Sequence, residues 1–469
     1  MSRHACWLLP WLAVCACAGP PVWEQPPPPV IDAPVVQPGA LQRAELENGL
    51  RILVLEDHRL PRVSFTLTLR HGEASLSAEQ AGLASLTAEL LKRGAGARDA
   101  LALASATDDL GATLGAGAGW DSIGVGVAGL SRDADTLLAI LADVVLRPRF
   151  DPREALRARS ERLAALEGAK DDPATLLSWY AAGALYPEHR FGAPSDGTPE
   201  SVARFDARAA RDLHHRFFVP NDAVLAVVGD VETQDVLARV RGAFGAWPRG
   251  PVVADGEPPP AQVPPARRVI VVDQADLVQA RVLVAHEGIA RGDPDRVAAG
   301  LLNSVVGGSG FSSRLMTRVR SEAGLTYSVG SGFSLRRAPG PFVISTFTRV
   351  PEVRRVIDLL LGELERARSE PPSESELASA RTLAVGEFAL GLETSGAVMS
   401  ALVDLDVYGL PEDSLDSYRG RVRATTTKQT AALAQRLFHP ERTLIVLVGP
   451  ASALTPQLEG LGPMEVIQP

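Results

Sequence analysis

Hydrophobic and polar residues alternate along two stretches of the chain, residues 63–69 and 124–130. A period of two places alternate side chains on opposite faces of a strand. Residues 80–91, 133–146 and 152–166 instead carry apolar side chains three and four positions apart, which is typical of helices with one buried face. The pattern therefore predicts strands interspersed with helices.

A longer pattern occurs twice, at an offset of 220 residues. Residues 215–229 have the features of a helix end, a proline and an apolar strand closed by glycine, and residues 435–449 repeat that order. The apolar segments 50–55 and 268–273 correspond as opening strands. We therefore expect an α+β fold of two homologous halves, each a mostly antiparallel sheet with helices packed on one face.

Two proline-rich segments mark boundaries in the chain. Residues 20–38 contain eight prolines and residues 248–265 contain seven, and such compositions favour extended linkers. We divide the chain into a signal segment 1–16, a tether 17–40, an N-terminal domain 41–247, a linker 248–266 and a C-terminal domain 267–469.

Composition excludes several function classes. The chain has 469 residues, 46% hydrophobic and 22% charged, with a net charge of -9. A nucleic-acid partner is not expected, because a phosphate backbone requires a basic surface. The three cysteines, Cys6, Cys15 and Cys17, all lie in the first 17 residues. This position excludes a cysteine zinc site and a thiol nucleophile in the folded part.

The first residues have the features of an export signal. Arg3 is followed by a short apolar core and then by small residues. Residues 14–17 resemble a bacterial lipobox, with Cys17 as the lipidated first residue of the mature chain. Cleavage by an ordinary signal peptidase near Ala18 is the alternative. Because Ala18 replaces the aspartate that usually retains lipoproteins in the inner membrane, we expect a periplasmic lipoprotein anchored in the outer membrane of a Gram-negative bacterium.

Five segments resemble the zinc peptidases of the pitrilysin/insulinase family, peptidase family M16. The glycine-rich segment 307–315, Gly-Gly-Ser-Gly-Phe-Ser-Ser-Arg-Leu, is the most specific, and the others are 47–54, 82–94, 197–202 and 319–328. The likeness spans about residues 41–465 and is strongest to the short two-domain subfamily. It implies two homologous α+β halves and dimerisation into a chamber that encloses extended peptides.

The family's zinc motif, His-x-x-Glu-His, is absent at the matching positions. Its spacing puts both imidazoles on one helix face, and its Glu acts as general base on metal-bound water. Here the positions hold Ser85, Ala88 and Glu89. Glu167 lies near the expected third ligand, but carboxylates without imidazole do not make a credible zinc site. We expect no cofactor in this chain, and zinc in a partner chain.

The second half keeps a different part of the machinery. Arg320 and Tyr327 match the family's Arg/Tyr pair, which by resemblance binds the substrate backbone and stabilises the tetrahedral intermediate. We expect residues 319–323 to end a helix, Gly324 to cap it and residues 325–330 to begin a strand. The structural alternative is that Arg320 pairs with a nearby carboxylate such as Glu322, and that Tyr327 is half-buried.

The glycine-rich segment is interpreted as a peptide-binding loop. Gly307, Gly308, Ser309 and Gly310 lack the Lys-Ser/Thr sequence of a phosphate-binding P-loop. Glycine allows another backbone to approach closely, so we expect a bound peptide to contact these four residues.

Two function classes remain open. The first is the subunit of a heterodimeric metallopeptidase that supplies peptide binding and transition-state stabilisation to a homologous zinc-bearing M16 chain. The second is a catalytically inactive scaffold or peptide-binding lipoprotein. In either case we expect extended peptides as ligands, and contact with the membrane through the lipid anchor alone.

Overall fold

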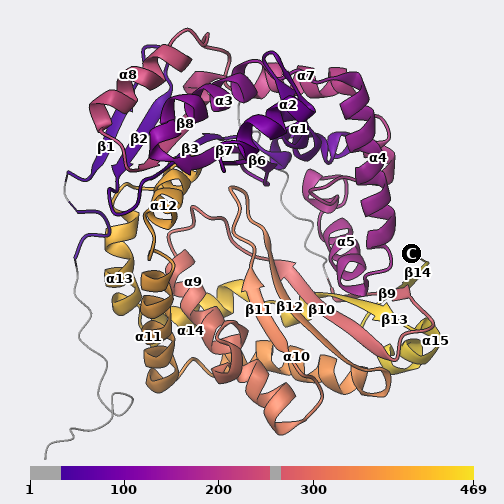
Figure 1. Cartoon of the computed structure of the whole chain (residues 1–469). Helices are drawn as coiled ribbons and strands as arrows, with labels where there is room; N and C mark the ends of the chain where they lie inside the picture. The colour runs from indigo at the N-terminus through magenta and orange to yellow at the C-terminus, as the bar shows by residue number, and fades with distance from the viewer. Residues whose placement is uncertain (1–32, 38, 254–265, 469) are drawn as a thin grey trace, which may run out of the picture. The chain divides into compact units, whose positions relative to one another are not determined.

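The computed structural model describes residues 33–37, 39–253 and 266–468 (Figure 1). The chain divides into two units, Met1–Pro34 and Val35–Pro469, and every helix and strand named below belongs to the second. The signal segment 1–16, Cys17, and most of the tether and the linker lie outside the described residues.

Each half of Val35–Pro469 contains a six-stranded sheet. The N-terminal sheet has the order β1-β2-β8-β3-β7-β6, and the C-terminal sheet has the order β14-β9-β13-β10-β12-β11. The strands of the first are β1 Leu41–Glu45, β2 Arg51–Glu56, β3 Arg62–Leu69, β6 Thr113–Ala118, β7 Ile123–Leu130 and β8 Ala223–Gly229. Those of the second are β9 Arg268–Asp273, β10 Gln279–Glu287, β11 Val329–Phe333, β12 Pro341–Arg349, β13 Leu444–Gly449 and β14 Met464–Ile467.

The two sheets match strand for strand. In each, one inner pair is parallel (β2 with β8, β9 with β13) and the pairs from there to β6 or β11 are antiparallel. The sheets differ at one edge, where β1 pairs antiparallel with β2 but β14 pairs parallel with β9. The two homologous α+β halves are therefore confirmed. A small hairpin of β4 Gly94–Ala95 and β5 Arg98–Asp99 lies outside both sheets.

Helices follow the strands in both halves. The first half contains α1 Leu83–Leu91, α2 Ala100–Asp108, α3 Ala134–Leu146, α4 Pro152–Ala169, α5 Pro173–Leu185, α6 Pro199–Val202, α7 Ala207–Phe217 and α8 Thr233–Phe244. The second contains α9 Arg296–Asn303, α10 Val353–Ser369, α11 Glu374–Leu390, α12 Ser395–Tyr408, α13 Ser414–Ala424, α14 Thr427–Leu437 and α15 Ala451–Leu454. The helices predicted at residues 80–91, 133–146 and 152–166 are α1, α3 and α4.

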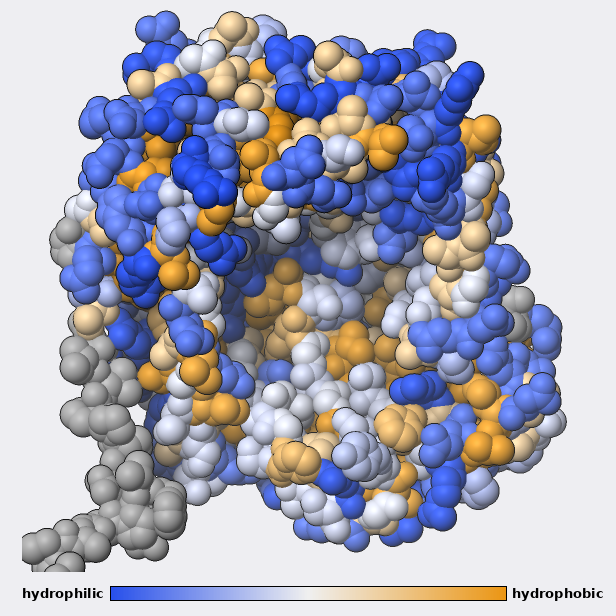
Figure 2. Space-filling view, in the orientation of Figure 1, coloured by the Kyte–Doolittle hydropathy of each residue, from blue (hydrophilic) through white to orange (hydrophobic). Residues whose placement is uncertain are grey.

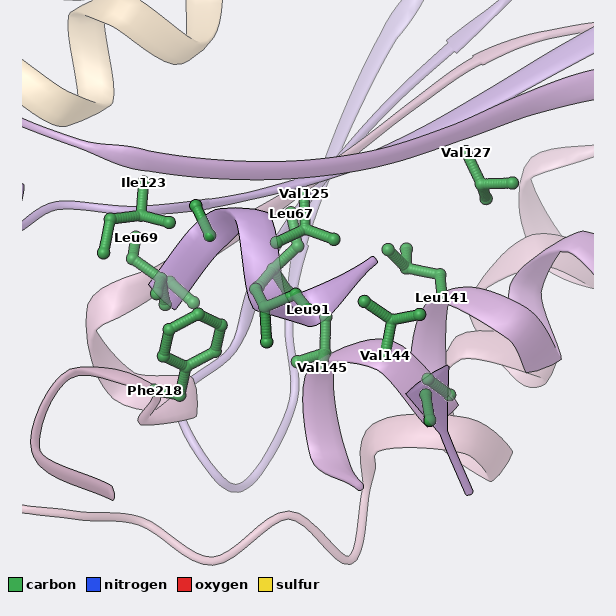
Figure 3. Close-up of a cluster of buried hydrophobic side chains, with 14 of the residues drawn as sticks. Leu67, Leu69, Leu91, Ile123, Val125, Val127, Leu141, Val144, Val145 and Phe218 are labelled. Atoms are coloured by element: carbon green, nitrogen blue, oxygen red, sulfur yellow. The ribbon is translucent and has the colours of Figure 1, made fainter. Parts of the chain in front are cut away.

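The main core of the N-terminal half lies between its sheet and its own helices. Figure 3 shows side chains of β3, β7, α1 and α3 in one buried cluster, among them Leu67, Val125, Leu91, Leu141 and Val144. Each of these five is almost completely inaccessible to solvent. This is the face that the alternating strands and the three- and four-residue helix spacing predict.

The opposite face of each sheet receives a helix from the other half. Helix α5 lies on the C-terminal sheet and α12 lies on the N-terminal sheet (Figure 1). Leu177 and Ala181 of α5 belong to one buried cluster with Val446, and Leu402 of α12 belongs to another with Leu53. Burial on both faces explains why β8 and β13 are almost uninterruptedly apolar. The sequence pattern did not predict this exchange of helices.

The outer surface of the helices at the top of Figure 2, which belong to the N-terminal half, is mainly hydrophilic. Among the described residues, no single helix has the length and composition needed to cross a membrane. Helices α11 and α12 meet those criteria only as a pair, bent by 109°.

Candidate functional site

A buried ion pair fixes the start of α1, the helix that carries the degenerate zinc motif. Glu73 accepts hydrogen bonds from the backbone N–H groups of Gly82 at 3.0 Å and Ser85 at 2.8 Å, and it also pairs with Arg190. Both charged side chains are almost fully buried. Burial raises the pKa of the Glu73 carboxyl, while Arg190 and the two amides oppose the shift. Because the first N–H groups of a helix have no partner within it, Glu73 caps α1.

Ser85, at the first position of the degenerate zinc motif, is hydrogen-bonded to the guanidinium of Arg162. The Ser85 hydroxyl donates to Oδ1 of Asp196 at 3.1 Å and accepts from Nη1 of Arg162 at 3.2 Å. Arg162, on α4, also forms an ion pair with Asp196. The serine is therefore already engaged in a charged network of the chain itself.

The third motif position is held by two further cations. Glu89 pairs with Nζ of Lys92 at 2.7 Å and with Nη2 of Arg93 at 3.1 Å, and Arg93 continues to Glu161 at 2.6 Å. Burial alone would raise the pKa of the Glu89 carboxyl, but Lys92 and Arg93 outweigh it and hold the pKa below its usual range. Between these two positions, the Ala88 methyl group is completely buried.

These residues do not fit a zinc ion. The three positions offer a hydroxyl beside a guanidinium, a methyl group and a carboxylate paired with two cations. The nearby positive charges of Arg162, Lys92 and Arg93 would repel a divalent cation. Glu167 is 71% exposed and pairs with Lys170. Across the described ranges, no group of three or more His, Cys, Asp or Glu side chains is arranged to hold a metal. That the chain itself binds no zinc stays a prediction.

Arg320 and Tyr327 lie on two connected segments of the C-terminal half. Arg320 belongs to the π-helical segment Met316–Glu322, after which Gly324 adopts the left-handed conformation at φ +64°. Tyr327 lies in the loop that follows. The prediction of a strand from residue 325 is wrong, because β11 begins only at Val329. Thr326 accounts for the delay: its hydroxyl bonds both the N–H and the C=O of Ser328, which competes with the sheet ladder.

Two buried threonines of β12 hold the Tyr327 loop. Thr346 donates to the carbonyl of Ser328 at 2.7 Å, and Thr348 donates to the carbonyl of Leu325 at 2.6 Å. The two bonds lie on either side of Tyr327. They fix the backbone that presents the tyrosine.

The Arg320 guanidinium lies between two aromatic rings. Its Cζ is 4.4 Å from the ring centroid of Phe311 and 5.0 Å from that of Tyr327. Phe311 is 73% exposed and Tyr327 is 74% exposed, so the alternative of a half-buried tyrosine is wrong. The negative ring faces attract the guanidinium and hold it between them. Phe311 was not among the predicted site residues; the available signal in the sequence was an aromatic residue directly after the glycine-rich turn.

The four glycine-rich positions have different surroundings. Gly307 is buried, and a Cβ there would lie 2.4 Å from Oγ of Ser331; a Cβ at Gly308 would lie 2.5 Å from Nδ2 of Asn303. A side chain at either position would therefore require its neighbours to shift. Gly310 has φ +59° and open space around it. Contact of these residues and Ser309 with a peptide stays a prediction.

Two ion pairs connect residues 311–320 to helices of the C-terminal half. Arg314 donates to both oxygens of Glu376, at 2.7 and 2.9 Å, and lowers the pKa of that carboxyl to about 2. Arg318 donates to Glu363 at 3.2 Å, and Glu363 is completely buried. Bidentate and buried charged contacts of this kind restrict movement. They tie the stretch between Phe311 and Arg320 to helices α10 and α11.

Known proteins resemble this chain in sequence and in fold. The model of the family described as "Peptidase M16 inactive domain" matches residues 204–383. An uncharacterized zinc protease of Streptomyces coelicolor is 26% identical over 417 residues, which cover 88% of this chain and 90% of the relative. The crystal structure of a peptidase M16 inactive domain from Pseudomonas fluorescens superimposes with a TM-score of 0.80 at 28% identity, covering 87% of this chain and 98% of that one. Over most of its length, the chain is therefore similar to proteins of the M16 peptidase family.

The match to the inactive-domain model covers only one of the two regions described above. The residues matched by the inactive-domain model include Arg320 and Tyr327 but not Ser85, Ala88 or Glu89. A protease from Helicobacter pylori has a TM-score of 0.79 at 17% identity, a similarity that concerns the fold alone.

Proposed function

We propose that this chain is the subunit without zinc in a two-chain metallopeptidase. It binds an extended peptide and stabilises the transition state, while a homologous chain carries the zinc. The observation that supports this proposal is the Arg320 guanidinium, held between the exposed rings of Phe311 and Tyr327.

The chemistry of the two residues suits a peptide backbone. The N–H donors of a guanidinium lie in its plane, so contacts with the ring faces leave the donors available to peptide carbonyl oxygens. The Tyr327 hydroxyl is a donor for the oxygen that becomes negatively charged during peptide-bond hydrolysis. One donor of this type typically contributes about 2.7–4 kcal/mol to lowering the barrier.

A partner chain is part of the proposal because the degenerate motif of α1 cannot supply the metal. The partner is a homologous zinc-bearing M16 chain, and the interface with it should bury more than ~2,000 Å², as obligate interfaces do. The complex is placed in the periplasm, on a lipid anchor at Cys17. It contacts the membrane through that lipid alone and binds no nucleic acid.

Purification from the source periplasm tests the proposal. A zinc-bearing homologue should be recovered with the tagged chain, and only the pair should cleave a quenched fluorescent peptide. Arg320→Ala should raise the KM of the pair and lower its kcat. The matched control Arg354→Ala, at an exposed arginine paired with Asp358, should leave both constants unchanged. A stable monomer without such a homologue, or unaltered kinetics in Arg320→Ala, would favour the scaffold function instead.

A further inference from the structure

Phe311 presents an aromatic ring to solvent from a rigid turn. Two aromatic residues, Phe311 and Tyr327, are among the large apolar side chains that the described part of the chain leaves exposed, and both lie against Arg320. Exposed aromatic and arginine side chains at one place are typical of the residues that dominate binding energy in interfaces. The grouping therefore points to a contact surface for a ligand.

The turn that carries Phe311 is held by its own hydroxyl groups. The Oγ atoms of Ser309 and Ser312 are 3.0 Å apart, and Ser313 donates to the carbonyl of Gly310 at 2.8 Å. Ser313 is completely buried, and the next residue, Arg314, is fixed by Glu376. A ring held in place before binding loses little conformational entropy when a ligand covers it.

We propose that Phe311 determines substrate specificity, by receiving a large apolar side chain of the peptide whose backbone Arg320 holds. This inference rests on the proposed function, since it assigns a role beside the same arginine. When a peptide carbonyl binds the edge of the Arg320 guanidinium, the adjacent side chain of the peptide lies near Phe311. The Phe311 ring packs on the face of that guanidinium. The Phe311 ring offers apolar area and no hydrogen-bond donor, so a large aliphatic or aromatic side chain is preferred there over a small polar one.

The preference should be measurable without any partner chain. Two blocked, fluorescently labelled decapeptides are used as probes, built from glycine, serine and threonine and differing only in a central phenylalanine or serine. The mature chain should bind the phenylalanine probe about 10-fold more tightly, the range that separates apolar side chains in a protein pocket. Fluorescence anisotropy gives both dissociation constants.

Variants separate Phe311 from Arg320. Phe311→Ala should abolish the difference between the two probes, and Phe311→Leu should retain part of it. Arg320→Ala should weaken both probes alike. The control Leu390→Ala removes a similarly exposed apolar side chain, 74% accessible, on α11 and should change neither constant. Because Phe311 is exposed, thermal unfolding of Phe311→Ala should match that of the wild type.

Each outcome decides a specific point. An unchanged probe preference in Phe311→Ala overturns the role of Phe311, as does the absence of binding of both probes to the wild type. If the preference depends on Phe311 but no partner restores cleavage, the specificity site stands and the peptidase proposal fails. Another outcome is that the reconstituted pair cleaves both probes at equal rates, and that the pair containing Phe311→Ala shows those same rates. The peptidase proposal then stands, and the specificity role of Phe311 fails.

Discussion

Arg162 donates a hydrogen bond from Nη1 to the hydroxyl of Ser85, at 3.2 Å, where the M16 zinc motif has its first histidine. A cation of the protein therefore lies beside the position of a metal ligand. The absence of zinc-binding residues on α1 is accompanied by a guanidinium on α4 that would oppose a metal ion electrostatically. This relationship makes restoration of the motif alone insufficient.

The mature chain should retain no stoichiometric zinc after dialysis. A triple variant that restores the zinc motif, Ser85→His, Ala88→Glu and Glu89→His, should also retain none. Arg162 still repels the ion, and Glu167, near the expected third ligand, is exposed and paired with Lys170. Adding Arg162→Glu removes the cation and supplies a carboxylate, so the fourfold variant should gain about one zinc per chain. Mass spectrometry of the metal content measures all three proteins. One tightly held zinc in the wild type or the triple variant would contradict this account.

Arg190→Met should destabilise the protein strongly. It leaves the Glu73 carboxylate buried without its cation at the start of α1, and breaking a buried pair on one side typically costs about 3–5 kcal/mol. The free energy of unfolding in urea, followed by circular dichroism, measures the loss. Arg208→Met breaks the exposed pair with Asp212 and should cost less than ~1 kcal/mol. Equal losses of unfolding free energy in the two variants would contradict a stabilising role for the buried Glu73–Arg190 pair.

Stability should fall in mild acid because of His286. This side chain is completely buried and stacks on Phe342, and burial lowers its pKa from 6.5 to about 4. The unfolded chain therefore binds more protons between these values, so stability is full above pH 6.5 and decreases as pH falls toward 4. His286→Phe should make the pH profile of unfolding flatter, whatever its stability at pH 7. Parallel profiles for the variant and the wild type would contradict the assignment.

Thr348→Val should make the Tyr327 loop more mobile. Valine has nearly the same shape as threonine but lacks the hydroxyl group. The substitution leaves the Leu325 carbonyl without its hydroxyl donor, at a cost of about 1–3 kcal/mol. Amide hydrogen exchange within Leu325–Ser328 should accelerate, while exchange in β10 and β13 stays as in the wild type. Thr427→Val at the half-buried first residue of α14 is the control. Unchanged exchange in the loop would mean that Thr348 does not hold it.

The repeat in the sequence predicted most of the fold. The apolar strand and closing glycine at residues 223–229 and 444–449 are local features, so their copies could be recognised without any knowledge of packing. The exchange of α5 and α12 could not, because an apolar helix face does not specify which sheet it covers. The start of α1 was placed too early for a local reason: Gly82, at φ +88°, interrupts the helix before Leu83.

The candidate site was predicted only in part. Arg320 and Tyr327 could be identified from the family motif. Phe311 could be recognised only from the structure, in which its ring centroid lies 4.4 Å from Cζ of Arg320. Arg162 and Asp196 are distant in sequence from Ser85 and have no motif of their own. Contacts between residues so far apart along the chain depend on the packing of α1 against α4, which periodicity does not encode.

We propose above all that Tyr327 takes part in peptide-bond hydrolysis, although α1 lacks the histidines of the zinc motif. Tyr327→Phe removes one hydroxyl from a side chain that is 74% exposed, so folding and association with the partner should be unchanged. The decisive measurement is kcat of the reconstituted pair on a quenched peptide, with equal dimer content shown by size. We expect kcat to fall about 10²-fold or more, because the developing oxyanion loses one hydrogen-bond donor. A kcat equal to that of the wild type would contradict it.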